Sequence, residues 1–182
     1  WDKKRQQLFC SRDRYGIKPF FWTKNSKSFY FGSELKQFIV NDIGRQCNYE
    51  ELSIYLYGGC TNSTNQTFFK GINSLEPGHS LLINYLGEMK INKWYDLEES
   101  INPVQNKLDL EEFNYLLTNS IKLRMRSDVK VGSALSGGLD SSTILKLASN
   151  TINNDKNNIF AIHAKSSEKV TDESDYARIA AN

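Results

Sequence analysis

The chain has 182 residues, of which 39% are hydrophobic and 24% are charged, and its formal net charge is +2. This length allows one full domain or parts of two, and the composition is that of a globular protein rather than a disordered tail. No apolar run approaches the roughly 20 residues that span a bilayer, and the basic residues are scattered, so we expect neither membrane insertion nor a nucleic-acid partner. The three cysteines are odd in number and lack CxxC spacing. This pattern argues against a disulfide framework or a zinc site and favours a reducing, cytoplasmic setting.

The N-terminal part of the chain carries patterns typical of short strands and helices. Residues 7–12 have mixed strand character, and residues 20–23 and 28–31 are aromatic and β-branched runs joined by a short polar turn, which predicts a hairpin. Residues 34–40 and 50–57 predict helices, the second of which ends at a pair of glycines.

A Pro-Gly turn introduces a second predicted hairpin, with strands at residues 81–83 and 89–95. Residues 96–108 are polar, contain a proline and show no clear hydrophobic period. We therefore expect a linker at residues 96–108 between two domains, residues 1–95 and 109–182.

A helix is predicted directly after this linker. Asp109 stands where an N-cap is expected, because its side chain can accept hydrogen bonds from the unpaired N–H groups of a first turn. The residues that follow form an apolar stripe at helical spacing: Leu110, Phe113, Leu116, Leu117 and Ile121.

The rest of the chain alternates strand and helix patterns. Residues 129–135 predict a buried strand, residues 136–140 a loop and residues 141–149 a helix. After a polar turn, residues 159–164 predict a second strand. Residues 171–182 predict a helix with acids in its first turn, where they suit the helix dipole: Asp172, Glu173 and Asp175. Strand, helix and strand at this spacing predict a parallel sheet with a right-handed crossover.

The chemistry of the chain is concentrated in the loop after the first of these two strands. Gly137 and Gly138 let the backbone approach a ligand closely, and the first N–H groups of the next helix are unpaired and partly positive, which suits phosphate. Asp140 would repel a bare phosphate, so we expect Mg²⁺ between its carboxylate and the phosphate oxygens. The loop lacks the Gly-Lys-Ser/Thr of a Walker A motif. A site without that lysine fits ATP that is cleaved between its α and β phosphates.

The sequence Ser-Gly-Gly-Leu-Asp-Ser-Ser at residues 136–142 resembles the pyrophosphate loop of the glutamine-hydrolysing asparagine synthetase family. Residues 11–19 resemble the RDR-aromatic-GIKP signature of that family's amidotransferase domain, and residues 31–36, 71–79 and 93–95 continue the match in order. The loop alone is shared with other ATP pyrophosphatases, such as GMP synthetase. The amidotransferase signature narrows the resemblance to the asparagine synthetase family. The resemblance covers essentially the whole chain.

The resemblance implies a fold in two parts. The first is an α+β amidotransferase portion of the Ntn type, and the second is an α/β parallel-sheet ATP-pyrophosphatase portion of the adenine nucleotide alpha hydrolase-like type. It also implies that glutamine is hydrolysed by the first domain, that aspartate is adenylated by ATP with Mg²⁺ in the second, and that ammonia converts β-aspartyl-AMP to asparagine. The positions that match ATP-binding residues of the family, with Asp140 also expected to hold Mg²⁺, are Leu135, Ser136, Gly137, Gly138, Leu139, Asp140, Ser141, Ser142 and Ile162.

No catalytic residue of the family is expected within this chain. In the family the nucleophilic cysteine and the glutamine-binding residues lie upstream of the position of Trp1, and further synthetase residues lie downstream of Asn182. We therefore expect an internal fragment of a longer protein, inactive by itself. Its expected partners are small molecules, namely aspartate, glutamine or ammonia, and ATP. The oligomeric state stays open, with a homodimer as one expectation.

Two alternatives remain open at the level of sequence. The same architecture could act on another carboxylate, as in β-lactam synthetase or in amidotransferases of sugars and peptides. The chain could also be a non-catalytic nucleotide-binding remnant.

Two further sets of residues are interpreted as structural. Charged residues near the start of the chain are interpreted as an ion-pair network that fixes a turn: Arg12, Asp13, Arg14 and Lys18. His163 is also interpreted as structural, although it follows Ile162 on the strand whose end is expected to face the nucleotide.

Overall fold

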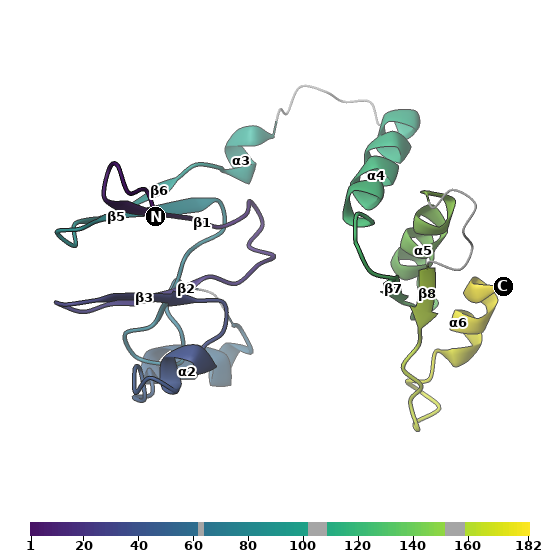
Figure 1. Ribbon diagram of the computed structural model, residues 1–182. Coiled ribbons are helices and arrows are strands. Elements are labelled where there is room, and N and C mark those ends of the chain that lie inside the picture. The colour runs from purple at the N-terminus through teal and green to yellow at the C-terminus, as the bar shows by residue number, and fades with distance from the viewer. Residues whose placement is uncertain (62–63, 102–108, 152–158) are drawn as a thin grey trace. The chain divides into compact units, whose positions relative to one another are not determined.

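In a computed structural model, the structure describes residues 1–61, 64–101, 109–151 and 159–182 (Figure 1). The chain divides into two compact units, Trp1–Val104 and Gln105–Asn182. Most of the predicted linker and the polar turn predicted at residues 153–158 lie outside the described residues. None of the described helices is both long enough and apolar enough to cross a membrane.

The first unit contains two small antiparallel sheets, with strand orders β1-β5-β6 and β3-β2-β4. Both predicted hairpins are confirmed, as β2 with β3 and β5 with β6. Residues 96–108 show no hydrophobic period, yet they contain a short helix, α3. Asp96 stabilises this helix because its side chain accepts hydrogen bonds from the first N–H groups. The described elements of this unit are β1 (Gln7–Ser11), β2 (Phe21–Lys24), β3 (Phe29–Gly32), α1 (Lys36–Ile39), α2 (Tyr49–Gly58), β4 (Asn73–Ser74), β5 (His79–Asn84), β6 (Met89–Lys93) and α3 (Leu97–Ser100).

The core of the first unit lies between its two sheets, which face each other, while α2 lies on the outer side of the β3-β2-β4 sheet (Figure 1). Side chains in β5 alternate between more and less buried positions, as expected for a strand with one face on a core. The buried cluster consists of Cys10, Leu75, Leu81 and Ile83. It is covered by partly buried residues that lie in the two sheets or, for Phe20, directly before β2: Leu8, Phe20, Trp22, Phe29 and Met89.

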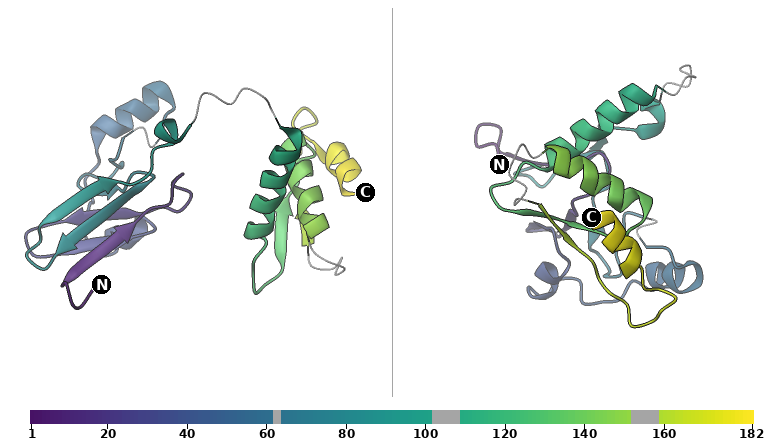
Figure 2. Two further views of the ribbon diagram at one scale, coloured as in Figure 1. Left: turned by 90° about the horizontal axis from the view of Figure 1, so that it is seen from above. Right: turned by 90° about the vertical axis from the view of Figure 1, so that its right-hand side faces the viewer.

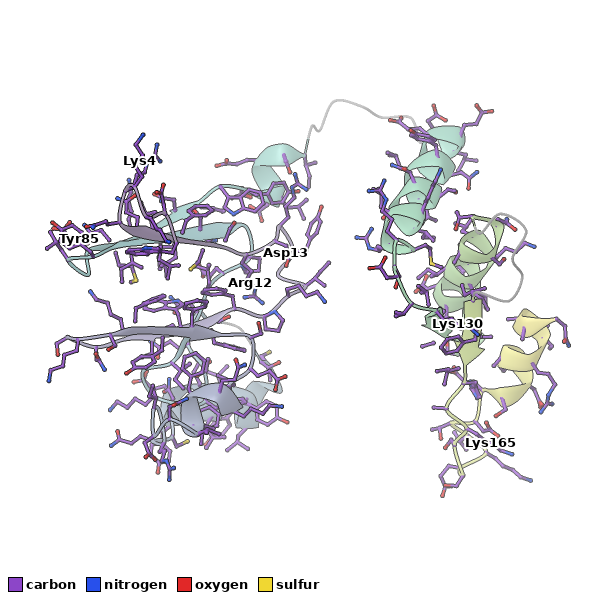
Figure 3. All side chains as sticks on the ribbon, in the orientation of Figure 1. Lys4, Arg12, Asp13, Tyr85, Lys130 and Lys165 are labelled. Carbon is purple, nitrogen blue, oxygen red and sulfur yellow. The ribbon has the colours of Figure 1, made fainter. Side chains whose placement is uncertain are left out.

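The loop after β1 is held in place by the guanidinium group of Arg12 (Figure 3). Its Nε and Nη2 atoms donate to the carbonyl oxygens of Lys18 and Gly16, each at 3.0 Å. Its Nη1 donates to Ser74 Oγ at 3.0 Å and to the carbonyl oxygen of Leu75. A single side chain therefore ties this loop to the end of β4.

Asp13 organises the same loop from the other side. Its carboxylate accepts hydrogen bonds from the N–H groups of Tyr15, Ile17 and Lys18 at 3.2, 3.0 and 3.0 Å. These bonds, that from Lys18 most strongly, hold the pKa of Asp13 below its usual value.

Arg14 lies over two aromatic rings, with its guanidinium carbon 5.8 Å from the ring centroid of Trp94 and 5.5 Å from that of Tyr95. The interpretation of these charged residues as an ion-pair network is therefore wrong. Within the described ranges, none of these four residues forms an ion pair. The side chains of Arg12, Asp13 and Arg14 instead contact carbonyl oxygens, N–H groups and aromatic rings, respectively, and Lys18 takes part through its backbone N–H and carbonyl oxygen. The expected role of Arg12 and Asp13 in fixing a turn is confirmed.

The second unit contains a pair of strands, β7 and β8, that are parallel to each other. Helix α4 packs against α5, and Figure 2 shows the two running side by side. The predicted N-cap is confirmed, since Asp109 Oδ1 accepts from the N–H groups of Glu111 and Glu112 at 3.0 and 3.1 Å. The described elements are α4 (Leu110–Arg124), β7 (Val131–Ala134), α5 (Leu139–Thr151), β8 (Ile159–Ile162) and α6 (Ser174–Ala181).

The predicted buried strand at residues 129–135 is shorter and more exposed in the structure. Only Val131–Ala134 is a strand, its residues alternate between half-buried and exposed, and Val129 is 76% exposed. The physical reason is that, in the described part of the chain, β7 pairs with β8 alone.

Two predicted helix starts in this unit are also wrong. Helix α5 begins at Leu139 and not at residue 141, because Gly138 already accepts a hydrogen bond from the N–H of Ser142 at 3.1 Å. Helix α6 begins at Ser174, so Asp172 and Glu173 precede it and only Asp175 is in its first turn. Asp172 instead accepts from the N–H of Ser174 at 3.1 Å.

The core of the first unit makes a direct prediction. Leu81 is 0% exposed, so Leu81→Ala should lower the free energy of unfolding of this unit by about 2–5 kcal/mol, because it leaves a cavity. All three tryptophans lie in the first unit, so urea unfolding followed by tryptophan fluorescence reports on this unit specifically. Leu86, which is 66% exposed, provides the control, and Leu86→Ala should change this free energy by less than about 0.5 kcal/mol. Equal losses in the two variants would contradict the core assignment.

The Asp13 carboxylate predicts a response to acid. Because its folded-state pKa is below its unfolded value, its contribution to stability is complete above about pH 4 and is lost as the pH falls through the folded-state pKa. Asp13→Asn should be less stable than wild type at pH 7, since the amide cannot accept from Lys18 with its nitrogen. The difference in melting temperature between wild type and Asp13→Asn should become smaller below pH 4. A constant gap from pH 7 to pH 2 would show that the charge of Asp13 is unimportant.

Candidate nucleotide-binding site

The loop between β7 and α5 is anchored at its start by Leu135. This residue is 3% exposed, and its N–H donates to the carbonyl oxygen of Ile162 at 2.9 Å, which continues the pairing of β7 with β8. Gly137 has a φ of +90°, a conformation that residues with a side chain rarely adopt. A Cβ at this position would lie 2.5 Å from backbone atoms of Tyr176 and Ala177. The glycine therefore allows α6 to lie directly against the loop.

Hydroxyl groups hold the loop in a closed turn. Ser141 Oγ accepts a hydrogen bond from the N–H of Ser136 at 3.3 Å, and it lies 3.0 Å from Ser136 Oγ. Ser136 Oγ in turn accepts a hydrogen bond from the N–H of Gly138 at 3.3 Å. Ser142 Oγ is buried and has no hydrogen-bond partner among the described residues. A buried hydroxyl without a partner costs free energy.

The first turn of α5 presents backbone N–H groups at the same place. Within the described ranges, the N–H groups of Leu139, Asp140 and Ser141 donate to no protein acceptor. Three unpaired N–H groups at the positive end of a helix, next to serine hydroxyls, form a site that fits the oxygens of a phosphate. The geometry of this loop is thus compatible with the phosphate site expected from the sequence.

The metal expectation rests on Asp140, which is exposed in the first turn of α5. The described residues contain no group of three or more His, Cys, Asp or Glu side chains placed to hold a metal ion. Asp140 would therefore hold Mg²⁺ only together with oxygens of a bound phosphate, which is a coordination that Mg²⁺ commonly adopts.

A cleft of about 690 Å³ lies beside the loop, along β7 and β8 and past their carboxyl ends. It brings together three of the residues expected to contact ATP, namely Leu135, Ser136 and Ile162. Ile162 is 61% exposed, so it offers an apolar surface there. Leu139 does not line the cleft and is 84% exposed in the helix. The role of each residue in binding stays a prediction.

Seven further lining residues are not among those expected to contact ATP, and they include His163, which the sequence analysis interprets as structural: Gly132, Ser133, Ala134, Phe160, His163, Ala164 and Glu173. Gly132 and Phe160 belong together, because a Cβ on Gly132 would lie 2.6 Å from the Phe160 ring. A glycine inside a strand was the one available signal, since it often marks close approach of another group.

Comparison with known proteins agrees with these features. A glutamine amidotransferase domain model matches residues 1–95, and an asparagine synthase model matches residues 112–182. The chain belongs to the glutamine-hydrolysing asparagine synthetase family.

Individual relatives agree with this membership. The chain is 39% identical over 149 residues to a putative asparagine synthetase [glutamine-hydrolyzing] 2 of Methanocaldococcus jannaschii, covering 80% of this chain and 29% of that protein. It is 36% identical over 149 residues to asparagine synthetase [glutamine-hydrolyzing] 3 of Bacillus subtilis, covering 81% and 24%. It is also 30% identical over 156 residues to amidase chry2 of Gibberella zeae, covering 84% and 23%. The chain therefore spans between 23% and 29% of the length of these relatives.

Gly137 and Gly138 provide a matched pair of variants in this asparagine synthetase-family chain. Gly137→Ala should displace α6, because the new Cβ meets backbone atoms and the positive φ costs about 1–3 kcal/mol. Gly138→Ala meets only Ser136 Oγ, at 3.4 Å, and should be tolerated. Hydrogen exchange followed by mass spectrometry should show faster exchange in residues 174–181 for Gly137→Ala alone. Identical exchange in both variants would rule out the close packing of α6 on the loop.

Proposed function

We propose that the second unit binds ATP at the loop and cleft just described, in a protein that makes asparagine with glutamine as the nitrogen source. Membership of the family supports the reaction class. The observation that carries the proposal is the junction at Gly137, where unpaired helix N–H groups and serine hydroxyls adjoin an apolar cleft. We assign the unit to the α/β parallel-sheet ATP-pyrophosphatase type and the first unit to the Ntn-type amidotransferases.

In the proposed reaction, a carboxylate oxygen of aspartate attacks the α-phosphorus of ATP, and the bond to the bridging oxygen breaks to release pyrophosphate. Ammonia from glutamine then attacks the acyl carbon and displaces AMP. The N–H groups of residues 139–141 would bind the departing pyrophosphate, whose negative charge increases as the bond breaks. Leu135 and Ile162 would hold the adenosine in the cleft. Mg²⁺, when bound at Asp140, would neutralise phosphate charge.

The first unit would take part in glutamine hydrolysis, as its match to a glutamine amidotransferase domain supports. Cys10 lies in β1 and is 7% exposed, and this burial raises the pKa of its thiol. A buried thiol with a raised pKa is a poor nucleophile. This observation supports the expectation that Cys10 is not the catalytic cysteine.

A second candidate function keeps the ATP chemistry but changes the acceptor. It is favoured by the relative named amidase chry2 and by amidase chyE of Penicillium rubens, which is 30% identical over 148 residues. In this case the loop would activate a carboxylate other than aspartate. The acceptor is what separates the two candidates.

The test uses the whole protein that contains this chain, with aspartate, ammonia and ATP, and measures AMP and ADP. We expect AMP and pyrophosphate to form only when aspartate is present. AMP formation only with another carboxylate would favour the second candidate, and no AMP with any carboxylate would contradict both.

Asp140→Ala should reduce AMP formation by about 100-fold or more, because phosphate charge would no longer be neutralised there. Glutamine hydrolysis should be largely unchanged, because Asp140 lies outside the amidotransferase unit. Asp128→Ala, which removes an exposed carboxylate outside the loop, is the matched control. Equal loss of both activities in Asp140→Ala would contradict this division of labour.

A further inference from the structure

His163 follows β8 directly and reaches back to the residue that precedes the phosphate loop. Its Nδ1 atom lies 2.8 Å from the carbonyl oxygen of Leu135. Because a carbonyl oxygen only accepts, Nδ1 carries a proton and donates it. The N–H of Leu135 is already bonded to the carbonyl oxygen of Ile162. Both backbone polar groups of Leu135 are thus held by two consecutive residues at the end of β8.

The opposite edge of the same ring reaches α6. Nε2 of His163 lies 3.2 Å from Oγ of Ser174, the first residue of that helix. Ser174 Oγ also donates to Asp172, and this bond lowers the pKa of the Asp172 carboxyl, with smaller contributions from the charges of Lys165 and His163. Three residues after Ser174, the backbone of α6 lies against Gly137. One imidazole ring therefore connects the residue before the loop to the helix that lies against the loop.

The protons in this cluster are limited in number. Ser174 has a single hydroxyl proton, and both Asp172 and the Nε2 atom of a neutral His163 would accept it. The bond from Nδ1 to Leu135 does not depend on this choice, since it persists whether the ring is neutral or charged. The hydrogen bond from Nδ1 to the Leu135 carbonyl oxygen is therefore the contact that the ring keeps in either protonation state.

We propose that His163 is a positioning residue for the nucleotide loop. Its ring holds the Leu135 carbonyl oxygen and the start of α6, so that the loop N–H groups keep the spacing that phosphate requires. The inference rests on the proposed function for its ligand, but the positioning itself is a property of the free chain. His163 would act through Leu135 and Ser174 and not by donating to the phosphate.

Two variants of His163 separate positioning from simple packing. His163→Leu fills much of the same volume but has no donor, and it should weaken binding of ATP and of pyrophosphate to the chain by about tenfold, which corresponds to the loss of a typical hydrogen bond. His163→Asn places an amide N–H near the position of Nδ1 and should restore most of that affinity. Calorimetry with each ligand measures both effects, and circular dichroism confirms that each variant is folded.

Hydrogen exchange provides a readout that needs no ligand. In the free chain, His163→Leu should increase exchange at the N–H groups of this loop that are hydrogen-bonded to the protein, and His163→Asn should return it towards wild type. These N–H groups are those of Leu135, Ser136, Gly138 and Ser142. If wild type binds neither ATP nor pyrophosphate, the proposed function fails, while exchange still decides the role of His163. Unchanged exchange in His163→Leu, or a folded His163→Asn that restores neither exchange nor affinity, would overturn the inference.

Discussion

The second unit is built around one close contact, in which the backbone of α6 lies against Gly137. The positive φ of this residue turns the chain from β7 into α5 within a few residues, and the absence of a side chain leaves room for α6. The turn exposes the N–H groups at the start of α5, and the position of α6 brings Ser174 within reach of His163. The loop geometry on which we base the proposed phosphate site and the network that supports it thus depend on the same glycine.

In the first unit, two charged side chains hold an irregular segment of backbone in place. Its loop after β1 has many backbone groups that no strand or helix satisfies. Arg12 donates to three carbonyl oxygens and Asp13 accepts from three N–H groups, so two side chains satisfy six backbone groups. Hydrogen bonds to charged groups are stronger than those between neutral groups, which suits them to fixing an irregular segment.

These features fit a protein whose binding and catalytic groups come from different segments. The described residues supply unpaired N–H groups, hydroxyls and an apolar cleft, which suit the proposed binding of a nucleotide, whereas the one buried thiol among the described residues of the first unit is unsuited to nucleophilic attack. The family matches cover residues 1–95 and 112–182, so this binding surface and the amidotransferase unit belong to one family architecture. In that setting the positioning of the loop by His163 would affect nucleotide affinity without any direct part in the chemistry.

The sequence by itself determined the features that depend on near neighbours. Both hairpins, the Asp109 cap of α4 and the left-handed Gly59 that ends α2 follow from residues a few positions apart. The same holds for the glycine-serine loop, whose motif is contiguous.

Tertiary structure alone decided the features that depend on distant partners. Arg12 bonds to Ser74, which is 62 positions away, and His163 bonds to Leu135, which is 28 positions away. Likewise, the exposure of β7 is set by how many strands pair beside it, and not by its own apolar residues. Residue type indicates that a group needs a partner, but only the path of the chain through space determines which partner it meets.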